Sequence, residues 1–160
     1  MEPKIKELPK KLMVGKSIRM SLVENKTAEL WQGFMQRRQE VKNRVDNDLY
    51  SIQRYDSINY FSVFNPKTEF TKYAMVEVSN LSEIPGDMEG MVLEGGLYAV
   101  FTHKGKPETF SRTAEFIYGK WLPNSAYELD DRPHFEILGE KYKRDSDDSE
   151  EEVWIPIKLI

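Results

Sequence analysis

Residues 97–122, with the sequence LYAVFTHKGKPETFSRTAEFIYGKWL, decide the fold because a strand, a turn and a helix follow one another directly. The segment 97–103 is rich in aromatic and β-branched residues and predicts a strand. Gly105 and Pro107 then predict a turn. The helix that follows ends before Pro123, because proline disfavours helical geometry in the residue before it. It places four apolar residues on one face, namely Phe110, Ala114, Ile117 and Trp121.

This helix carries a short motif that recurs earlier in the chain. The sequence TAEF at 113–116 with Gly119 matches TAEL at 27–30 with Gly33, at a shift of 86 residues. One predicted strand precedes each copy and two follow it. The predicted strands span 11–21, 49–55 and 73–78 in the first half, and 97–103, 134–138 and 153–159 in the second.

The order of elements predicts an α+β fold made of two pseudo-symmetric strand–helix–strand–strand modules with a ligand cleft between them. Module one covers about 11–78 and module two covers 97–160. The segment 79–96 is rich in turn-forming residues and is expected to be a connecting loop. The whole chain, 1–160, is expected to be a single domain, which suits its length.

Composition indicates a soluble globular protein, with 39% hydrophobic and 31% charged residues. No apolar run approaches the ~20 residues that span a bilayer, and the N-terminus lacks the apolar core of a signal peptide. The chain has no cysteine, which fits a reducing compartment. We therefore expect a cytoplasmic protein with no membrane contact.

The net charge of −4 argues against direct binding of nucleic acid, because such binding depends on cations that neutralise phosphates. The run 144–152, RDSDDSEEE, is expected to be a solvated loop, or less readily a surface for a basic protein partner. The two histidines are 31 residues apart with no carboxylate at ligand spacing, so no metal and no cofactor are expected.

The second half resembles the GyrI-like, or AraC-type effector-binding, domain family in three ordered segments. These are WLPNSAY at 121–127, PHFE at 133–136 and EVWIPI at 152–157. YAVFTHKG at 98–105 and the Leu30-Trp31 pair fit the same pattern. The resemblance implies two modules around a cleft that binds varied, often aromatic and cationic compounds, and it identifies Glu136 as the pocket glutamate. Relatives often carry a tyrosine two positions later, where this chain has Leu138.

Strand alternation places Glu136 on the face opposite Phe135 and Ile137. From spacing alone, an exposed glutamate or a partner of Lys141 or Lys143 is the more ordinary interpretation. The resemblance favours a carboxylate in an aromatic pocket, where burial raises its pKa unless a cation compensates. Such a group suits a counter-ion for a lipophilic cation and equally a general acid or base.

Six further residues are candidates for contact with the ligand, each with core packing or surface exposure as the alternative. They are Trp154, Leu138, Trp31, Met35, Tyr50 and Tyr118. Trp154 is chosen for stacking or cation–π contact. Tyr50 is chosen because the shift of 86 residues brings it onto Glu136.

Three functions follow from the resemblance. The first is a stand-alone protein that senses or sequesters amphiphilic, aromatic and often cationic compounds; no helix-turn-helix is recognisable, so the chain would not by itself be a complete transcription factor. The second is a hydrolase of cyclopropane-containing DNA-alkylating toxins, in which Glu136 would be catalytic. The third is a protein–protein modulator of DNA gyrase. The sequence leaves open whether the protein is an enzyme.

Overall fold

The structure is a computed structural model that describes residues 1–143 and 146–160. Arg144 and Asp145, part of the predicted acidic loop, lie outside the described residues. The first half contains β1 (Lys4–Leu8), β2 (Lys11–Met20), α1 (Thr27–Met35), the 3-10 turn η1 (Arg38–Glu40), β3 (Leu49–Arg54) and β4 (Phe70–Val78). The second half contains β5 (Glu89–Leu93), β6 (Gly96–Lys104), η2 (Pro107–Thr109), α2 (Phe110–Phe116), the π-helical turn η3 (Ile117–Trp121), η4 (Leu122–Asn124), β7 (Tyr127–Leu129), β8 (His134–Leu138) and β9 (Glu150–Leu159).

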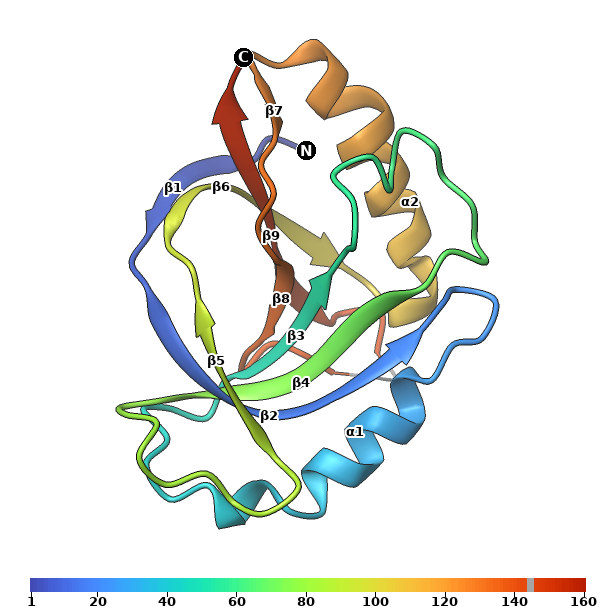
Figure 1. Cartoon of the computed structure of the whole chain (residues 1–160). Coiled ribbons are helices and arrows are strands. Elements are labelled where there is room, and N and C mark those ends of the chain that lie inside the picture. Colours follow the sequence, from blue (N-terminus) through green and yellow to red (C-terminus); the bar gives the residue numbers. More distant parts are fainter. Residues whose placement is uncertain (144–145) are drawn as a thin grey trace.

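The predicted α+β fold of two pseudo-symmetric modules is confirmed. All strand pairs are antiparallel, in the order β1-β6-β9-β8-β3-β4-β2-β5, with β7 paired to β9. On either side of the central β3–β8 pair, the order β4-β2 in module one mirrors β9-β6 in module two. Figure 1 shows α1 and α2 on the same side of the molecule, with β3 and β4 between them.

The sheet curls until its two ends meet. Leu8 lies opposite Gly96 in the β1–β6 pair, and Lys11 lies opposite Leu93 in the β2–β5 pair. Only two residues of each chain segment separate these pairs, so 4–15 and 89–100 form one continuous antiparallel ribbon that crosses between the modules (Figure 1). The result is a closed, barrel-like sheet.

The strand that begins each half of the chain therefore pairs with a strand of the other half. β1 precedes β2 but pairs with β6, and β5 precedes β6 but pairs with β2. The segment 79–96, expected to be only a loop, thus contains a strand. Met91 and Leu93 alternate inward from β5 and are buried, although the glycines and proline nearby indicated turns.

The interior of the curled sheet and its outer face hold separate cores. The interior core consists of Leu8, Met13, Tyr50, Ile52, Met75, Met91, Leu93, Tyr98, Val100, Phe135 and Trp154. On the outer face, α1 packs over β2 and β4, and α2 with η3 packs over β6 and β9. α1 ends at Met35, and Val45 in the segment beyond it is exposed.

No helix of the described part is both long and apolar enough to cross a membrane.

Candidate functional site

The outer face of the sheet is polar where β3 and β8 meet, between the two helix-covered cores. Ser51 lies opposite Glu136, and Gln53 lies opposite His134. Because alternate residues of a strand share a face, Leu138 belongs to the same surface. Lys72 of β4 lies opposite Gln53 and adds a cation to this face. Glu151 of β9 adds a second carboxylate.

Glu136 is partly buried and accepts a hydrogen bond from Nε2 of Gln53 to its Oε1 at 3.2 Å. The same Nε2 lies 3.2 Å from Oγ of Ser51. Desolvation raises the pKa of Glu136 from 4.5 to about 8, against the opposing attraction of Lys72, while the charge of Glu151 raises it further. The carboxyl group is therefore poised between its two protonation states near neutral pH.

The pKa values of the other two ionisable groups, Lys72 and Glu151, are also shifted so that the neutral form is favoured. Burial lowers the pKa of Lys72, opposed by the attraction of Glu136 and Glu151. Burial raises the pKa of Glu151 from 4.5 to about 7, opposed by Lys72. Three interacting ionisable groups thus share one weakly solvated surface.

An aromatic cluster lies beside the carboxylate of Glu136. Phe61 stacks on Tyr118 with ring centroids 3.8 Å apart, and Tyr55 meets the ring of His134 edge-on at 5.0 Å. The hydroxyl of Tyr118 lies 2.9 Å from Nδ1 of His134. Burial raises the pKa of both tyrosines well above 10.0, and the negative charge of Glu136 contributes to both shifts. We define Tyr55, Phe61, Tyr118 and His134 as the aromatic cap.

His134 is held neutral within this cap. Burial, with a smaller contribution from the charge of Arg132, lowers its pKa from 6.5 to about 3. The cap therefore combines aromatic rings and tyrosine hydroxyl groups with no positive charge. The face between the modules thus combines a carboxylate with aromatic rings, as expected for a site that takes a lipophilic cation.

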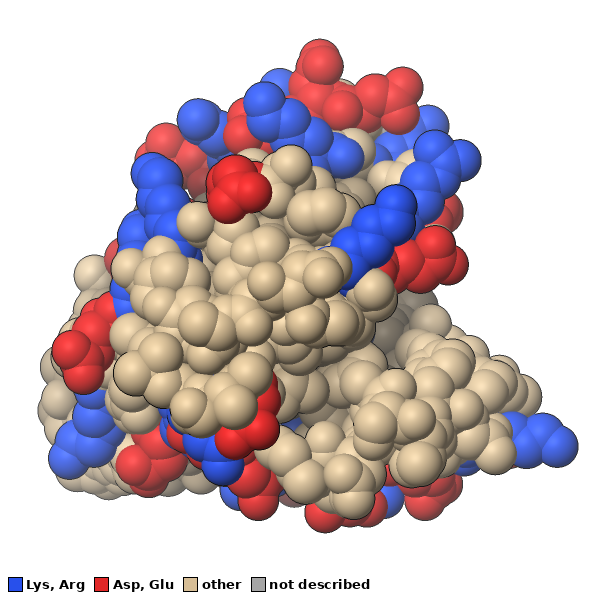
Figure 2. Space-filling model, turned by 90° about the horizontal axis from the view of Figure 1, so that it is seen from above, with Lys and Arg blue, Asp and Glu red and all other residues tan. Residues whose placement is uncertain are grey.

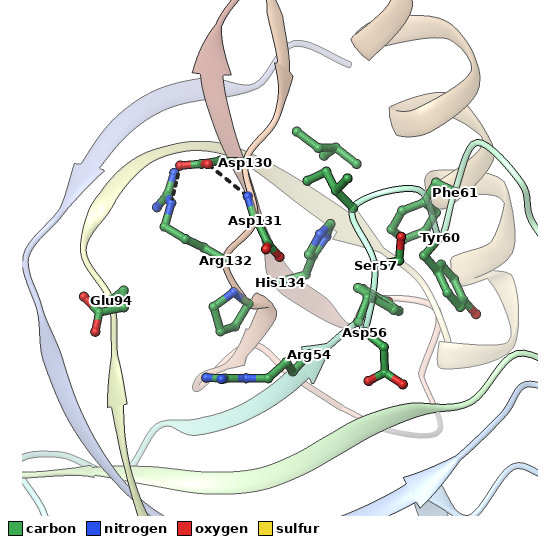
Figure 3. A pocket seen from close by; sticks show the side chains of 14 residues that line it. Arg54, Asp56, Ser57, Tyr60, Phe61, Glu94, Asp130, Asp131, Arg132 and His134 are labelled. Atoms are coloured by element: carbon green, nitrogen blue, oxygen red, sulfur yellow. Dashed lines mark hydrogen bonds and ion pairs between the residues drawn. The ribbon is translucent and has the colours of Figure 1, made fainter.

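A cavity of ≈ 360 Å³ opens on the other side of the cap, at one mouth of the barrel (Figure 3). Tyr55, Phe61 and His134 line it, and Glu136 does not. Arg132 also lines it and is held by a 2.8 Å ion pair to Asp130 and by hydrogen bonds to carbonyl groups. The remaining lining residues are Arg54, Asp56, Ser57, Ile58, Tyr60, Glu94, Leu129, Asp131 and Pro133.

The structure brings together only some of the residues predicted for the site. Tyr118 and Leu138 share the surface of Glu136. Trp31 is half-buried and packs edge-on against Phe34 of the α1 core, 6.1 Å between ring centroids. Met35, at the end of α1, is 41% exposed. Neither of these two has a described contact with Glu136.

Trp154 and Tyr50 lie on the opposite face of the sheet from Glu136, inside the barrel. Trp154 stacks on Phe135 at 5.3 Å between ring centroids, and its Nε1 donates to Glu152. Tyr50 packs against the same phenylalanine at 5.7 Å. Both are core residues, so the prediction that they share a cleft with Glu136 is not supported.

For Tyr50, the reason for this difference is the parity of the strands. Ser51, not Tyr50, lies opposite Glu136, and Tyr50 lies opposite Ile137. Outward side chains are odd-numbered in β3 and even-numbered in β8, so only an odd shift superposes their faces. The helical motif gave an even shift of 86 residues, and a one-residue error moves a side chain to the other face.

Sequence reasoning missed six residues of this surface: Ser51, Gln53, Tyr55, Lys72, His134 and Glu151. The alternation of β3, β4, β8 and β9 predicts which face each of them occupies, once the face of one residue in each strand is known. The distant loop residue Phe61 gives no such signal, because its position depends on the chain path between β3 and β4.

Within the described residues, no group of three or more histidine, aspartate or glutamate side chains is arranged to hold a metal ion. Seen from above, acidic and basic side chains are mixed around the rim of the face shown, without a broad region of one sign (Figure 2).

Known proteins resemble this chain in sequence and in fold. The transcriptional regulator BrlR of Pseudomonas aeruginosa is 26% identical over 159 residues, which cover 98% of this chain and 56% of BrlR. The chain thus spans about half the length of that curated relative.

Two solved structures share the fold. SAV2435 bound to tetraphenylphosphonium has a TM-score of 0.76 at 17% identity, covering 99% of this chain and 94% of that one. A hydrolase from Listeria innocua has a TM-score of 0.60 at 11% identity, with 98% and 92% covered. The family model described as a GyrI-like small molecule binding domain matches residues 1–158. The chain therefore belongs to the GyrI-like family of small-molecule-binding domains.

Proposed function

We propose that this GyrI-like domain binds amphiphilic, aromatic and cationic small molecules at the surface formed by Glu136 and the aromatic cap, and thereby senses or sequesters drugs or toxins. The observation that carries the proposal is a partly buried carboxylate beside four stacked or edge-packed rings. A lipophilic cation would compensate the charge of Glu136 and place its apolar groups against the rings.

Two further points support this choice of ligand. The related SAV2435 structure contains tetraphenylphosphonium, a cation surrounded by aromatic rings. The cap itself carries no positive charge, because burial keeps His134 neutral. We also propose that the protein acts in the cytoplasm, since its cysteine-free composition fits a reducing compartment.

Calorimetric titration with tetraphenylphosphonium tests the proposal. Glu136→Gln keeps the size of the side chain and removes its charge, and we expect it to weaken binding at least tenfold at pH 8. The matched control is Glu140→Gln, since Glu140 is exposed in the turn after β8 and its loss should leave affinity within twofold. Equal affinity for wild type and Glu136→Gln would show that the site lies elsewhere.

A hydrolase is the second candidate, favoured by the pKa of Glu136. A carboxyl group that titrates near 8 is suited to general acid–base catalysis at neutral pH. The same fold occurs in a hydrolase from Listeria innocua. Mass spectrometry of a cyclopropane-containing aromatic alkylating agent, incubated with the protein, should show addition of one water if this function holds. Loss of that product in Glu136→Gln, with Glu140→Gln active, assigns the step to Glu136.

A further inference from the structure

Lys72 is a cation within a site expected to bind cations. Its Nζ donates a hydrogen bond to Oγ1 of Thr27, at the start of α1, at 3.3 Å. Among the described residues, no ion pair within 4.0 Å joins Lys72 to a carboxylate. Its ammonium nevertheless interacts with both Glu136 and Glu151, and each of these carboxylates is stabilised in its charged form by Lys72.

The groups that face these three residues come from every neighbouring element. β3 contributes the uncharged Ser51 and Gln53, and the cap contributes Tyr55, Tyr118 and neutral His134. On β6, His103 lies opposite Glu151 in the sheet and its Nδ1 lies 2.7 Å from Oγ1 of Thr113. The charge balance of the site is thus set mainly by Lys72 and the two glutamates.

We propose that Lys72 is a built-in counter-cation that sets the charge selectivity of the site, so that the wild-type protein prefers monovalent over divalent aromatic cations. This inference rests on the proposed function. With both glutamates ionised and Lys72 protonated, the site carries one uncompensated negative charge, which one ligand charge neutralises. A second ligand charge would lie unpaired in a weakly solvated environment, next to an ammonium of the same sign.

Removal of the ammonium changes this balance. In Lys72→Met no protein cation lowers the pKa of either glutamate, and compensation of both carboxylates in their charged form then takes two ligand charges. Selectivity should therefore move toward divalent ligands, whereas loss of a merely structural lysine would weaken both ligands alike.

Two probes of nearly equal shape isolate the effect of charge. 1-Methyl-4-phenylpyridinium carries one positive charge, and 1,1′-dimethyl-4,4′-bipyridinium carries two. Affinities are measured by calorimetry at pH 8 and constant ionic strength. We expect the wild-type protein to prefer the monocation at least fivefold, and Lys72→Met to shift the ratio of affinities at least tenfold toward the dication.

Three variants accompany the measurement. Lys72→Arg keeps the charge and should keep the wild-type ratio within threefold. Lys72→Gln retains a hydrogen-bond donor toward Thr27 but no charge, and should show the same shift as Lys72→Met. Lys10→Met makes the same change of net charge at an exposed position between β1 and β2, and should leave the ratio unchanged.

The outcomes separate this inference from the proposed function. If the wild-type protein binds the monocation but neither Lys72→Met nor Lys72→Gln moves the ratio, the role of Lys72 is refuted while the proposed function stands. If wild type binds neither the two probes nor tetraphenylphosphonium, both are refuted. An equal shift in Lys10→Met would also refute the inference, because net charge alone would then explain it.

Discussion

Glu136 links the site to the stability of the fold through its pKa. The group has a pKa of about 8 in the folded protein and an ordinary value of 4.5, so between these values the folded state binds more protons than the unfolded state. The stability contributed by protonated Glu136 is therefore complete below pH 4.5 and is lost as the pH rises toward 8. Ionisation of Glu136 therefore lowers the free energy of unfolding as the pH rises, as is common where function requires a buried charge.

This decrease is measurable in the interval from pH 6.5 to pH 8. We expect the free energy of unfolding of the wild-type protein to fall by about 1.6 kcal/mol more than that of Glu136→Gln across this interval. Urea denaturation at several pH values measures the difference, and Glu140→Gln should follow the wild type. Parallel curves for wild type and Glu136→Gln would mean that Glu136 titrates normally.

At the residue scale, the sequence predicted the face of Glu136 but not its neighbours. Alternation in β8 was sufficient to separate Glu136 from Phe135. It was insufficient for Trp154 and Tyr50, because each lies in a strand whose face relative to β8 depends on cross-strand register. Register is fixed by tertiary packing, so residues such as Lys72 could not be assigned to the site from local sequence.

At the element scale, the strands with strong alternation were predicted well. β8 has the predicted bounds, and β2 and β3 agree to within one residue. β1 and β5 were missed because each is only five residues long and lies beside glycine or proline. Their pairing partners are in the other module, and a local sequence pattern does not predict pairing with a strand about 90 residues away.

A close approach between β2 and β4 yields a prediction for Gly15. A Cβ atom at Gly15 would lie 1.9 Å from the carbonyl oxygen of Ala74, a backbone atom of the strand paired with β2. We expect Gly15→Ala to destabilise the protein by about 3 kcal/mol, because the two strands must separate. Thermal and urea denaturation measure the effect.

Gly119 is the matched control for this change. It lies in η3, and a Cβ there meets no atom within 4 Å. Gly119→Ala should be neutral or stabilise by about 0.5 kcal/mol, because alanine restricts the unfolded chain. Similar losses of stability in the two variants would indicate that an added methyl group is unfavourable at either position. The close contact between β2 and β4 would then not be the cause of the loss in Gly15→Ala.

At the scale of the whole molecule, the exchange of β1 and β5 explains how two small modules form one domain. Leu8 of β1 and Leu93 of β5 are buried in the interior core together with residues of both modules. Neither module could close this core alone, since each takes an edge strand from the other. The resulting barrel gives β3 and β8 a rigid base, and the polar site lies on their outer face where the helices leave it uncovered.

A disulfide between β1 and β6 tests this architecture directly, because the natural chain has no cysteine. Glu7 and Leu97 are paired across the two strands. We expect Glu7→Cys with Leu97→Cys to form an intramolecular disulfide on oxidation, which migrates as a monomer in non-reducing electrophoresis. Closure of a loop of about 90 residues should stabilise the fold by about 4 kcal/mol, provided that the bond fits without strain.

The control pairs Glu7→Cys with Lys104→Cys, since Lys104 lies at the far end of β6, opposite Glu150 rather than β1. This pair should remain reduced within the monomer. A disulfide-linked dimer of the Glu7–Leu97 pair would instead show that β1 pairs with β6 of a second molecule. In that case the exchange of strands would occur between chains, and the barrel closed by 4–15 and 89–100 would be a property of the dimer.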